Sequence, residues 1–392
     1  MKIKLLVIFG GESVEHEVSI ISALQAIKNI DEDRYQVIPL YISKDKVWYT
    51  GNMLKEMEFY KDLDNNLKFA TKVVLYKKNK EFYLKKVDGI VNKDITSVDI
   101  VLPIVHGKGT EDGSLAGYLD TIGIPYVGSK VLGGAIGQDK VIIKQILRSE
   151  NIPVVDYIYF YDYEYLEEEN LILNNIKKMG YPVVVKPATL GSSIGINFVK
   201  CEKEIKSAIN EAIKYDNKIL IEKAVSNLIE VNASVIGNYE YQKVSCLEEV
   251  AGLDEILSFT DKYLSGSKSK GMVSTSRIIP AIISDKLTND IKETSKKVFK
   301  LLNLSGVCRI DYLIDKKTHK YYVNEPNTCP GSLSFYLWKE EGISYKEMLD
   351  EIITLAIKEY KNKNKKVKSF ESNILKGFNG SKGSKGLKGL KS

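Results

Sequence analysis

A predicted β-hairpin near the C-terminal end constrains the fold more than any other feature of the chain. Residues 307–314 and 321–327 have the apolar content and alternation of two short strands, and the polar run 315–320 joins them. Side chains two residues apart on a strand face the same side. Folding the hairpin therefore brings the carboxylates of Asp311 and Glu325 close together.

Two further polar residues share this face of the hairpin. Arg309 lies on the same side as Asp311, and Asn327 lies on the same side as Glu325. Two carboxylates and a carboxamide oxygen are hard ligands that suit Mg²⁺ shared with phosphate groups. The alternative is an exposed strand face with a surface ion pair, and the pattern alone leaves both interpretations open.

The first part of the chain has the alternating pattern of a parallel α/β sheet. Residues 3–9, 37–41 and 100–105 are apolar and strand-like, and residues 18–27 place apolar side chains on one helical face. Strand, helix and strand in alternation favour a parallel sheet covered by helices. Ligands bind such sheets beyond the carboxyl ends of the strands, where the loop 106–113 is expected.

Changes in pattern along the chain predict four segments. These are an N-terminal α/β domain at 1–128, a second domain at 129–226, a third at 227–370 and a flexible tail at 371–392. The tail is rich in Gly, Ser and Lys and cannot form a core. It holds five lysines and one glutamate, so most of the net charge of +6 lies there. The rest of the chain is nearly neutral, and we expect no nucleic-acid partner.

Composition excludes several other classes of protein. The longest apolar runs are too short to span a bilayer, and the N-terminus lacks the features of a secretory signal. Four cysteines without a C-x-x-C pair predict neither a disulfide framework nor a zinc site. We therefore expect a cytoplasmic protein with no membrane span.

A loop rich in glycine and serine, residues 189–195, follows a predicted strand that carries Lys186. Its backbone amides and hydroxyl groups could fold over a polyphosphate and shield it from water. The loop lacks the spacing of a P-loop. It matches the G-x-S-x-G pattern of α/β-hydrolases at Ser193, but the only later histidine is His319, in a lysine-rich turn, which disfavours a hydrolase.

Other charged residues could contact a nucleotide. Lys140 and Lys186 lie at transitions between apolar and polar sequence and would bring positive charge to phosphates. Residues 222–225 end an apolar strand and are a candidate adenine contact, and Glu230 is a candidate acceptor for ribose hydroxyls. Glu15 stands at a predicted helix start, where glutamates are common because they complement the helix dipole. Each residue alone is equally typical of an ordinary surface.

The order and spacing of these motifs resemble the ATP-grasp superfamily and, within it, the D-alanine:D-alanine ligase family. The motifs that carry the resemblance are residues 10–19, 106–113, 138–140, 185–187 with 191–195, 221–223, 261–264, 309–311 and 325–331. The resemblance covers roughly residues 3–360. It implies an α/β protein with the ATP-grasp fold, in which an N-terminal parallel α/β domain precedes two α+β domains that clasp ATP.

The resemblance also implies a role for each matching residue. It assigns ATP binding to Lys140, Lys186, Ser193, Glu222, Lys223, Val225, Glu230 and Lys262. It assigns two Mg²⁺ ions, or Mn²⁺, to Asp311, Glu325 and Asn327. It assigns catalysis to Glu15, Ser192, Tyr263, Arg309 and the backbone amide of Gly331, and substrate contacts to His106, Ser334 and Tyr336.

The implied reaction is the ATP-dependent joining of D-alanine to D-alanine through an acyl phosphate, for peptidoglycan synthesis. In the family that the chain resembles, a tyrosine at the position of Tyr263, beside Lys262, accompanies an amine nucleophile, so the resemblance implies an amide product. The family usually has a serine nine residues after the metal-binding asparagine, where this chain has Tyr336. D-Serine is therefore an alternative second substrate.

Two further hypotheses stay open at this point. One is an ATP-grasp ligase for another carboxylate and another amine. The other is a non-catalytic protein that binds anions with its lysine tail. The resemblance implies small-molecule partners and a homodimer.

Overall fold

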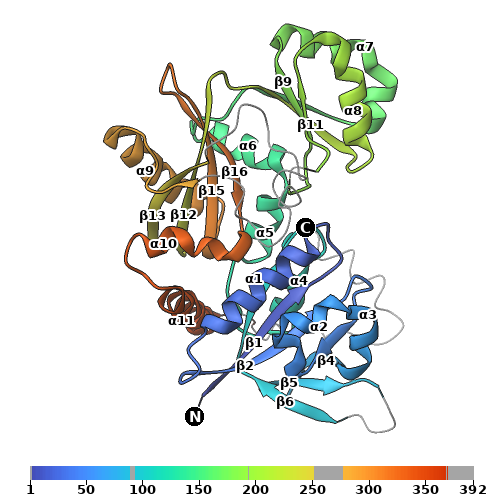
Figure 1. Ribbon diagram of the computed structural model, residues 1–392, viewed down its shortest axis with the longest axis vertical. Coiled ribbons are helices and arrows are strands. Elements are labelled where there is room, and N and C mark those ends of the chain that lie inside the picture. Colours follow the sequence, from blue (N-terminus) through green and yellow to red (C-terminus); the bar gives the residue numbers. More distant parts are fainter. Residues whose placement is uncertain (1, 89–92, 193, 251–276, 368, 370–392) are drawn as a thin grey trace, which may run out of the picture.

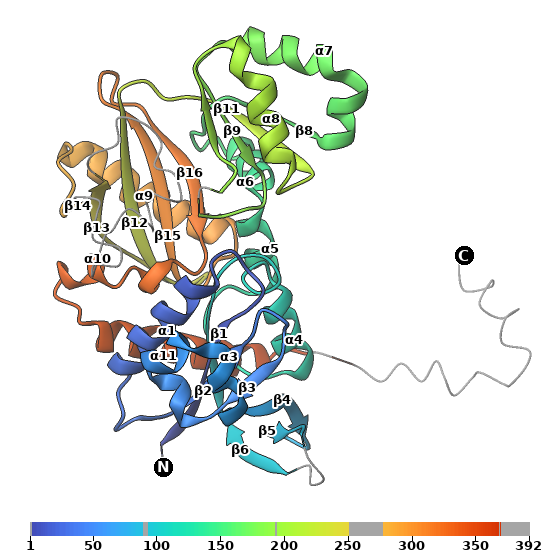
Figure 2. The ribbon, with the colours of Figure 1, turned by 45° about the vertical axis from the view of Figure 1, so that its right-hand side comes forward.

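Three β-sheets and the helices that cover them form the protein, as Figures 1 and 2 show. The computed structural model describes residues 2–88, 93–192, 194–250, 277–367 and 369. The N-terminal sheet lies at one end of the molecule, a four-stranded sheet at the other, and a five-stranded sheet between them (Figure 1). The architecture is the mixed α/β arrangement that the sequence predicts.

The first sheet has seven strands in the order β6-β5-β4-β3-β2-β1-β7. They are β1 (Ile3–Gly10), β2 (Tyr35–Ile42), β3 (Trp48–Thr50), β4 (Thr71–Lys78), β5 (Glu81–Lys86), β6 (Asp94–Val98) and β7 (Ile100–Val105). β1 is parallel to β2 and β7, as predicted, but β3 to β6 pair in antiparallel fashion. These four strands were not predicted, because β3 is only three residues long, lysines interrupt the apolar pattern of β4 and β5, and β6 is mostly polar.

Helices surround this first sheet and lead into the second. They are α1 (His16–Asn29), α2 (Met57–Lys61), α3 (Leu63–Asn66), α4 (Ser114–Ile122), α5 (Val131–Gln138) and the 3₁₀ turns η1 (Asn52–Lys55) and η2 (Leu67–Phe69). His16 opens α1, and its ring contacts the carbonyl of Gly11 at 2.6 Å and the hydroxyl of Tyr41 at 3.0 Å. His16 is therefore part of the scaffold beneath the loop that carries Glu15.

The four-stranded sheet has the order β10-β9-β11-β8. Its elements are α6 (Lys140–Ser149), β8 (Tyr157–Tyr161), α7 (Asp162–Met179), β9 (Val183–Pro187), β10 (Asn197–Val199), η3 (Glu202–Glu204), α8 (Ile205–Ile213) and β11 (Lys218–Lys223). Apolar side chains from α7, α8 and these strands form a separate core. The loop that carries Ser192 connects β9 to β10.

The five-stranded sheet has the order β14-β13-β12-β15-β16. Its elements are β12 (Leu228–Gly237), β13 (Gln242–Val250), β14 (Arg277–Ile278), α9 (Asp285–Leu301), β15 (Gly306–Asp315) and β16 (Tyr321–Asn327). The predicted hairpin is confirmed as β15 and β16, and the register pairs Asp311 with Glu325 and Arg309 with Asn327.

The last elements return the chain to the first sheet. They are η5 (Gly331–Ser334), α10 (Tyr336–Lys339) and α11 (Tyr345–Asn364). Met348 and Ile352 of α11 belong to the same buried cluster as Val7 of β1 and Leu24 of α1. Because the beginning and the end of the described chain share one core, the N-terminal sheet is held firmly against the hairpin sheet. Among the described helices, none has both the length and the apolar character needed to cross a bilayer.

Candidate active site

A cleft with an empty volume of about 1470 Å³ lies where the three sheets meet. Many of the residues singled out from the sequence line it, and they come from the five-stranded sheet and from loops and helices next to all three sheets: Glu15, His106, Lys140, Ser192, Glu230, Arg309, Asp311, Glu325, Asn327, Gly331 and Tyr336. Its walls are mostly polar, as expected of a site that binds charged ligands and not apolar ligands.

The hairpin supplies the charged floor of the cleft. Arg309 donates two hydrogen bonds to Asp311, from Nε to Oδ1 at 2.6 Å and from Nη2 to Oδ2 at 2.7 Å. Asn327 Nδ2 donates to Oδ2 of Asp311 at 3.1 Å. Burial opposes the charge of Arg309, but the adjacent Asp311 holds the pKa of the guanidinium well above its ordinary value. Arg309 therefore carries a permanent positive charge into the cleft.

The carboxylates of the hairpin fit a metal that is shared with a ligand. Among the described residues, no three His, Cys, Asp or Glu side chains are grouped closely enough to hold a metal ion without other donors. Mg²⁺ rarely needs such a cage, because it keeps several waters and binds one or two carboxylates together with phosphate oxygens. Asp311, Glu325 and Asn327 supply that kind of incomplete donor set beside one another.

Lys140 connects helix α6 to the hairpin through side-chain contacts. It is the first residue of α6, directly after Asp139, whose carboxylate caps the helix by accepting from the amides of residues 141 and 142. The Nζ atom of Lys140 lies 3.1 Å from Oε2 of Glu325 and donates to the carbonyl of Leu190 at 2.8 Å. The helix cap thus fixes an ammonium group between the hairpin and the loop at 189–195.

A buried cluster of three charges lies next to Lys140. Glu222 of β11 accepts from Lys186 of β9 through Oε2, and its Oε1 lies 2.5 Å from Nζ of Lys144. Glu222 and Lys144 are almost wholly inaccessible to solvent. Burial alone would raise the pKa of Glu222, but the attraction of the two ammonium groups outweighs burial and lowers the pKa to about 2.

Sequence reasoning missed Lys144, although a signal was present. Lys144 follows Lys140 by one helical turn in α6, so both side chains lie on the same helix face. A lysine on the buried face of an amphipathic helix needs a partner, and that partner is Glu222.

Glu222→Gln should destabilise the protein by about 3 kcal/mol at neutral pH, because it leaves two buried ammonium groups without their carboxylate. The pKa of Glu222 is depressed in the folded protein, so its contribution is complete above pH 4.5 and disappears as the pH falls toward 2. Urea denaturation of both proteins at pH 7 and pH 4 measures the difference, which should shrink at the lower pH. Glu211→Gln, in an exposed pair with Lys214, is the control that should change nothing. A difference that is absent at pH 7 would contradict the role of the cluster.

Not all residues assigned from the resemblance line the cleft. Lys186 and Glu222 lie behind it in the buried cluster, and Val225 is half-buried beyond the end of β11. Lys223 Nζ donates to the carbonyls of Gly180 and Tyr181, each at 3.0 Å. Ser334 is fully buried. Their roles in ligand binding stay predictions.

Three other assigned residues, Ser193, Lys262 and Tyr263, lie outside the described residues, as do the loop 264–276 and the tail 371–392.

Ser192, in the loop after β9, contacts Glu15, which directly precedes α1 in the N-terminal part of the chain. Ser192 Oγ donates a hydrogen bond to Oε1 of Glu15, although the two residues are 177 positions apart. A Cβ atom at Gly191 would come within 2.9 Å of Oε2 of Glu15, so glycine permits this close approach. The loop therefore covers the cleft directly above the Glu15 carboxylate.

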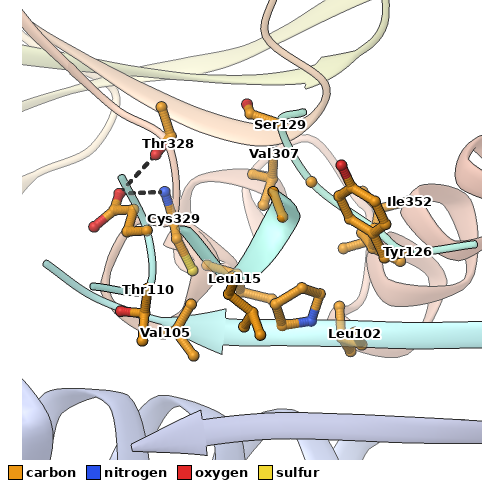
Figure 3. Close-up of a pocket in the computed structure, with 16 residues that line it drawn as sticks. Leu102, Val105, Thr110, Leu115, Tyr126, Ser129, Val307, Thr328, Cys329 and Ile352 are labelled. Atoms are coloured by element: carbon orange, nitrogen blue, oxygen red, sulfur yellow. Dashed lines mark hydrogen bonds between the residues drawn. The ribbon is translucent and has the colours of Figure 1, made fainter. Parts of the chain in front are cut away.

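Glu111 is a second residue that sequence reasoning missed. Its Oε1 accepts from Thr328 Oγ1 at 2.8 Å and from the amide of Cys329 at 2.9 Å, and its Oε2 accepts from the amide of Gly107 at 3.0 Å. In Figure 3, dashed lines from Thr328 and Cys329 mark the first two bonds. Burial raises the pKa of this carboxyl group. The Glu111 side chain therefore connects the loop after β7 to the segment after β16 and positions the neighbouring His106. The Nε2 atom of His106 has no hydrogen-bond partner among the described residues.

A smaller and more apolar cavity lies behind this connection (Figure 3). Leu102, Val105, Leu115 and Val307 line it, and Cys329 lines both cavities. Glu111 and Thr328, which are hydrogen-bonded to each other, line this cavity as well.

The turn η5 holds Gly331 at the edge of the cleft in an unusual backbone conformation. Ser332, Leu333 and Ser334 all have positive φ, between 50° and 52°. Left-handed backbone is unfavourable by roughly 1–2 kcal/mol per residue for residues other than glycine. Packing against α1 offsets this, because the amide of Ser332 donates to Ser22 Oγ at 2.9 Å and Leu333 is buried.

Two known protein families match most of the chain. Residues 4–129 match the family described as D-ala D-ala ligase N-terminus, and residues 146–354 match the family described as D-ala D-ala ligase C-terminus. A D-alanine–D-alanine ligase of Thermosipho melanesiensis is 40% identical over 373 residues, which cover 94% of this chain and 97% of the relative.

Solved structures agree with this similarity. The VanG D-Ala:D-Ser ligase from Enterococcus faecalis has a TM-score of 0.77 at 28% identity, covering 91% of this chain and 100% of that one. The D-alanine–D-alanine ligase from Bacillus anthracis complexed with ATP has a TM-score of 0.65 at 26% identity, covering 92% of this chain and 99% of that one.

Proposed function

Because the chain belongs to the D-alanine–D-alanine ligase family, we propose that it joins two molecules of D-alanine into a dipeptide and converts ATP to ADP and phosphate. The product is a building block of peptidoglycan. The observation that carries the proposal is the cleft itself, which brings the hairpin carboxylates, the lysine of α6 and the Glu15–Ser192 contact around one space.

The chemistry explains why a ligase needs these groups together. A carboxylate is a poor electrophile, so its oxygen first attacks the γ-phosphorus of ATP and ADP departs. The amine of the second amino acid then attacks the acyl carbon of the acyl phosphate, phosphate departs, and the amine loses a proton. Charge accumulates on the phosphoryl group in the first step and on the carbonyl oxygen in the second.

Phosphate binding would fall to two lysines, of which one lines the cleft and one lies behind it in the buried cluster. Lys140 and Lys186 would hold the ATP phosphates, with Ser193 in the covering loop. Asp311, Glu325 and Asn327 would hold two Mg²⁺ or Mn²⁺ ions, which when bound neutralise the phosphoryl oxygens. Adenine and ribose contacts would come from the set Glu222, Lys223, Val225, Lys262 and Glu230.

The amino acids would lie between the hairpin and the N-terminal sheet. Glu15 would bind the ammonium of the first D-alanine, with His106 beside it and Tyr263 coupled to Glu15 through Ser192. Arg309 and the amide of Gly331 would stabilise the oxyanion. The loop above Glu15 excludes water, which would otherwise hydrolyse the acyl phosphate.

Ser192→Ala should lower kcat/KM for the first D-alanine about 10- to 100-fold, because a hydrogen bond to a charged carboxylate contributes about 1.5–3 kcal/mol. Steady-state kinetics measures the effect. Circular dichroism should show an unchanged fold, and Ser149→Ala, at an exposed position of α6, is the control. A Ser192→Ala enzyme with wild-type kcat/KM would refute the role of the contact.

The identity of the second amino acid decides between two candidates. D-Alanine is favoured by the family, whereas Tyr336 in the substrate cleft leaves D-serine as the alternative. We also propose that the enzyme works in the cytoplasm, where ATP is supplied, and as a homodimer, which size-exclusion chromatography with light scattering would test.

A panel of amino acids tests the proposed function. Phosphate release from ATP and Mg²⁺ is followed with D-alanine, L-alanine, D-serine and mixtures of D-alanine with each of the other two. We expect D-alanine alone to support turnover and L-alanine alone to give none. Turnover that is indifferent to D-alanine would refute the proposal, and faster turnover with D-serine added would identify D-serine as the acceptor.

A further inference from the structure

In the proposed function, on which this inference rests, a second amino acid attacks the acyl phosphate. That amino acid offers the protein few polar groups to bind. Its amine reacts, so its carboxylate is the one remaining strongly polar group. A carboxylate that leaves bulk water for a partly closed cleft needs hydrogen-bond donors, and preferably a cation. The resemblance suggests the hydroxyl groups of Tyr336 and Ser334 for this task.

Neither hydroxyl group is suited to binding a carboxylate. The hydroxyl of Tyr336 donates its single proton to Oε1 of Glu248 at 2.8 Å, so it can only accept further hydrogen bonds. A carboxylate also only accepts. Ser334 is fully buried and does not line the cleft. Among the described side chains, the cations that line the cleft are the remaining candidates.

Three cations line the cleft within the described ranges, and two of them are engaged. Lys140 lies 3.1 Å from Glu325. Arg309 makes two short hydrogen bonds to Asp311 and is already assigned to the oxyanion in the proposed function. The third cation is Arg277, the first residue of β14.

Arg277 is held in place by contacts that, among the described residues, leave its N–H groups available as donors. Its guanidinium lies over the ring of Tyr336, 4.3 Å from the ring centroid. Its Nη1 atom is 3.7 Å from Oε2 of Glu248, which is beyond hydrogen-bond distance. Glu248 is itself fixed, because its Oε1 also accepts from Asn232 Nδ2 at 2.8 Å. The side chain of Arg277 is 29% exposed.

We propose that Arg277 binds the carboxylate of the second amino acid, with Tyr336 and Glu248 as positioning residues that orient its guanidinium. The planar fork of arginine can donate two parallel hydrogen bonds to a carboxylate, which a lysine cannot. The stacked ring fixes the plane of the fork, and the loose contact with Glu248 leaves N–H groups for the ligand. Arg277 then contributes to the enzyme's preference for a second amino acid with a free α-carboxylate.

A competition between two acceptors tests this assignment. D-Alaninamide has no carboxylate to phosphorylate, so it can serve only as the second substrate. The enzyme is given ATP, Mg²⁺, D-alanine and D-alaninamide, and mass spectrometry gives the ratio of D-alanyl-D-alanine to D-alanyl-D-alaninamide. Differences in amine reactivity cancel, because the same two acceptors compete in every variant.

Arg277→Gln should lower this ratio about 10- to 100-fold, the effect of losing charge-assisted hydrogen bonds. Arg277→Lys, which keeps the charge but loses the fork, should give an intermediate ratio. If Arg277 merely neutralised Glu248, both products would fall together and the ratio would stay constant. That result in either variant would overturn the proposal.

The chain offers a closely matched control. Arg148 also lies over a tyrosine, 4.5 Å from the ring centroid of Tyr157, and is 3.8 Å from Asp156, but it does not line the cleft. Arg148→Gln should leave the ratio unchanged, and a shift as large as that of Arg277→Gln would contradict a local effect. A wild-type enzyme that forms neither product would refute the proposed function instead, so the two failures are distinguishable.

Discussion

Glu325→Gln should lower the rate of ADP formation about a thousand-fold, which makes it one of the two most damaging substitutions expected in this protein. Glu325 faces Asp311 across the hairpin and lies 3.1 Å from Nζ of Lys140. Glutamine preserves size but removes the charge that attracts a divalent cation and orients Lys140. The loss should be smaller at high Mg²⁺ concentration, because mass action partly restores occupancy of a weakened site.

Steady-state ADP formation at several Mg²⁺ concentrations measures this effect. Glu293→Gln, on the exposed side of α9 in a pair with Lys296, is the matched control and should retain full activity. Wild-type activity in Glu325→Gln at low Mg²⁺ would mean that the hairpin carboxylates do not hold the metal.

Arg309→Lys should reduce kcat about 10²- to 10³-fold, the effect of removing one donor from an oxyanion site. Lysine keeps the positive charge, but it cannot make the two-point contact with Asp311 that orients Arg309. The KM for ATP should change less than kcat, because the oxyanion forms only when the amine attacks.

Separate measurement of kcat and KM distinguishes this role from a structural one. A simple loss of folded enzyme would reduce kcat in proportion to the folded fraction, which circular dichroism reports. If Arg309→Lys raised the KM for ATP strongly and left kcat unchanged, Arg309 would bind nucleotide rather than stabilise the transition state.

The features that could be predicted from sequence have short-range causes. The two-residue repeat of a strand places Arg309 and Asp311 on one face, and a short turn brings Glu325 opposite them, so the hairpin and its register were predictable. The parallel pairing of β1 with β2 and β7 was equally visible, because strands buried on both faces are continuously apolar.

The features that escaped prediction depend on contacts between distant segments. Lys144 meets Glu222, Glu111 meets Thr328, and Arg277 stacks on Tyr336, each across a large separation in sequence. A single sequence shows the residue types but not their partners. The antiparallel strands β3 to β6 were missed for a different reason, since their half-exposed faces lack a continuous apolar signal.

The balance between product and ADP tests the central claim most directly. The enzyme is incubated with ATP, Mg²⁺ and D-alanine, and mass spectrometry of the dipeptide is compared with the ADP formed. One D-alanyl-D-alanine should appear for each ADP, and none should form from L-alanine. ADP released without dipeptide, or at the same rate when D-alanine is left out, would contradict the assignment of this cleft to D-alanine ligation.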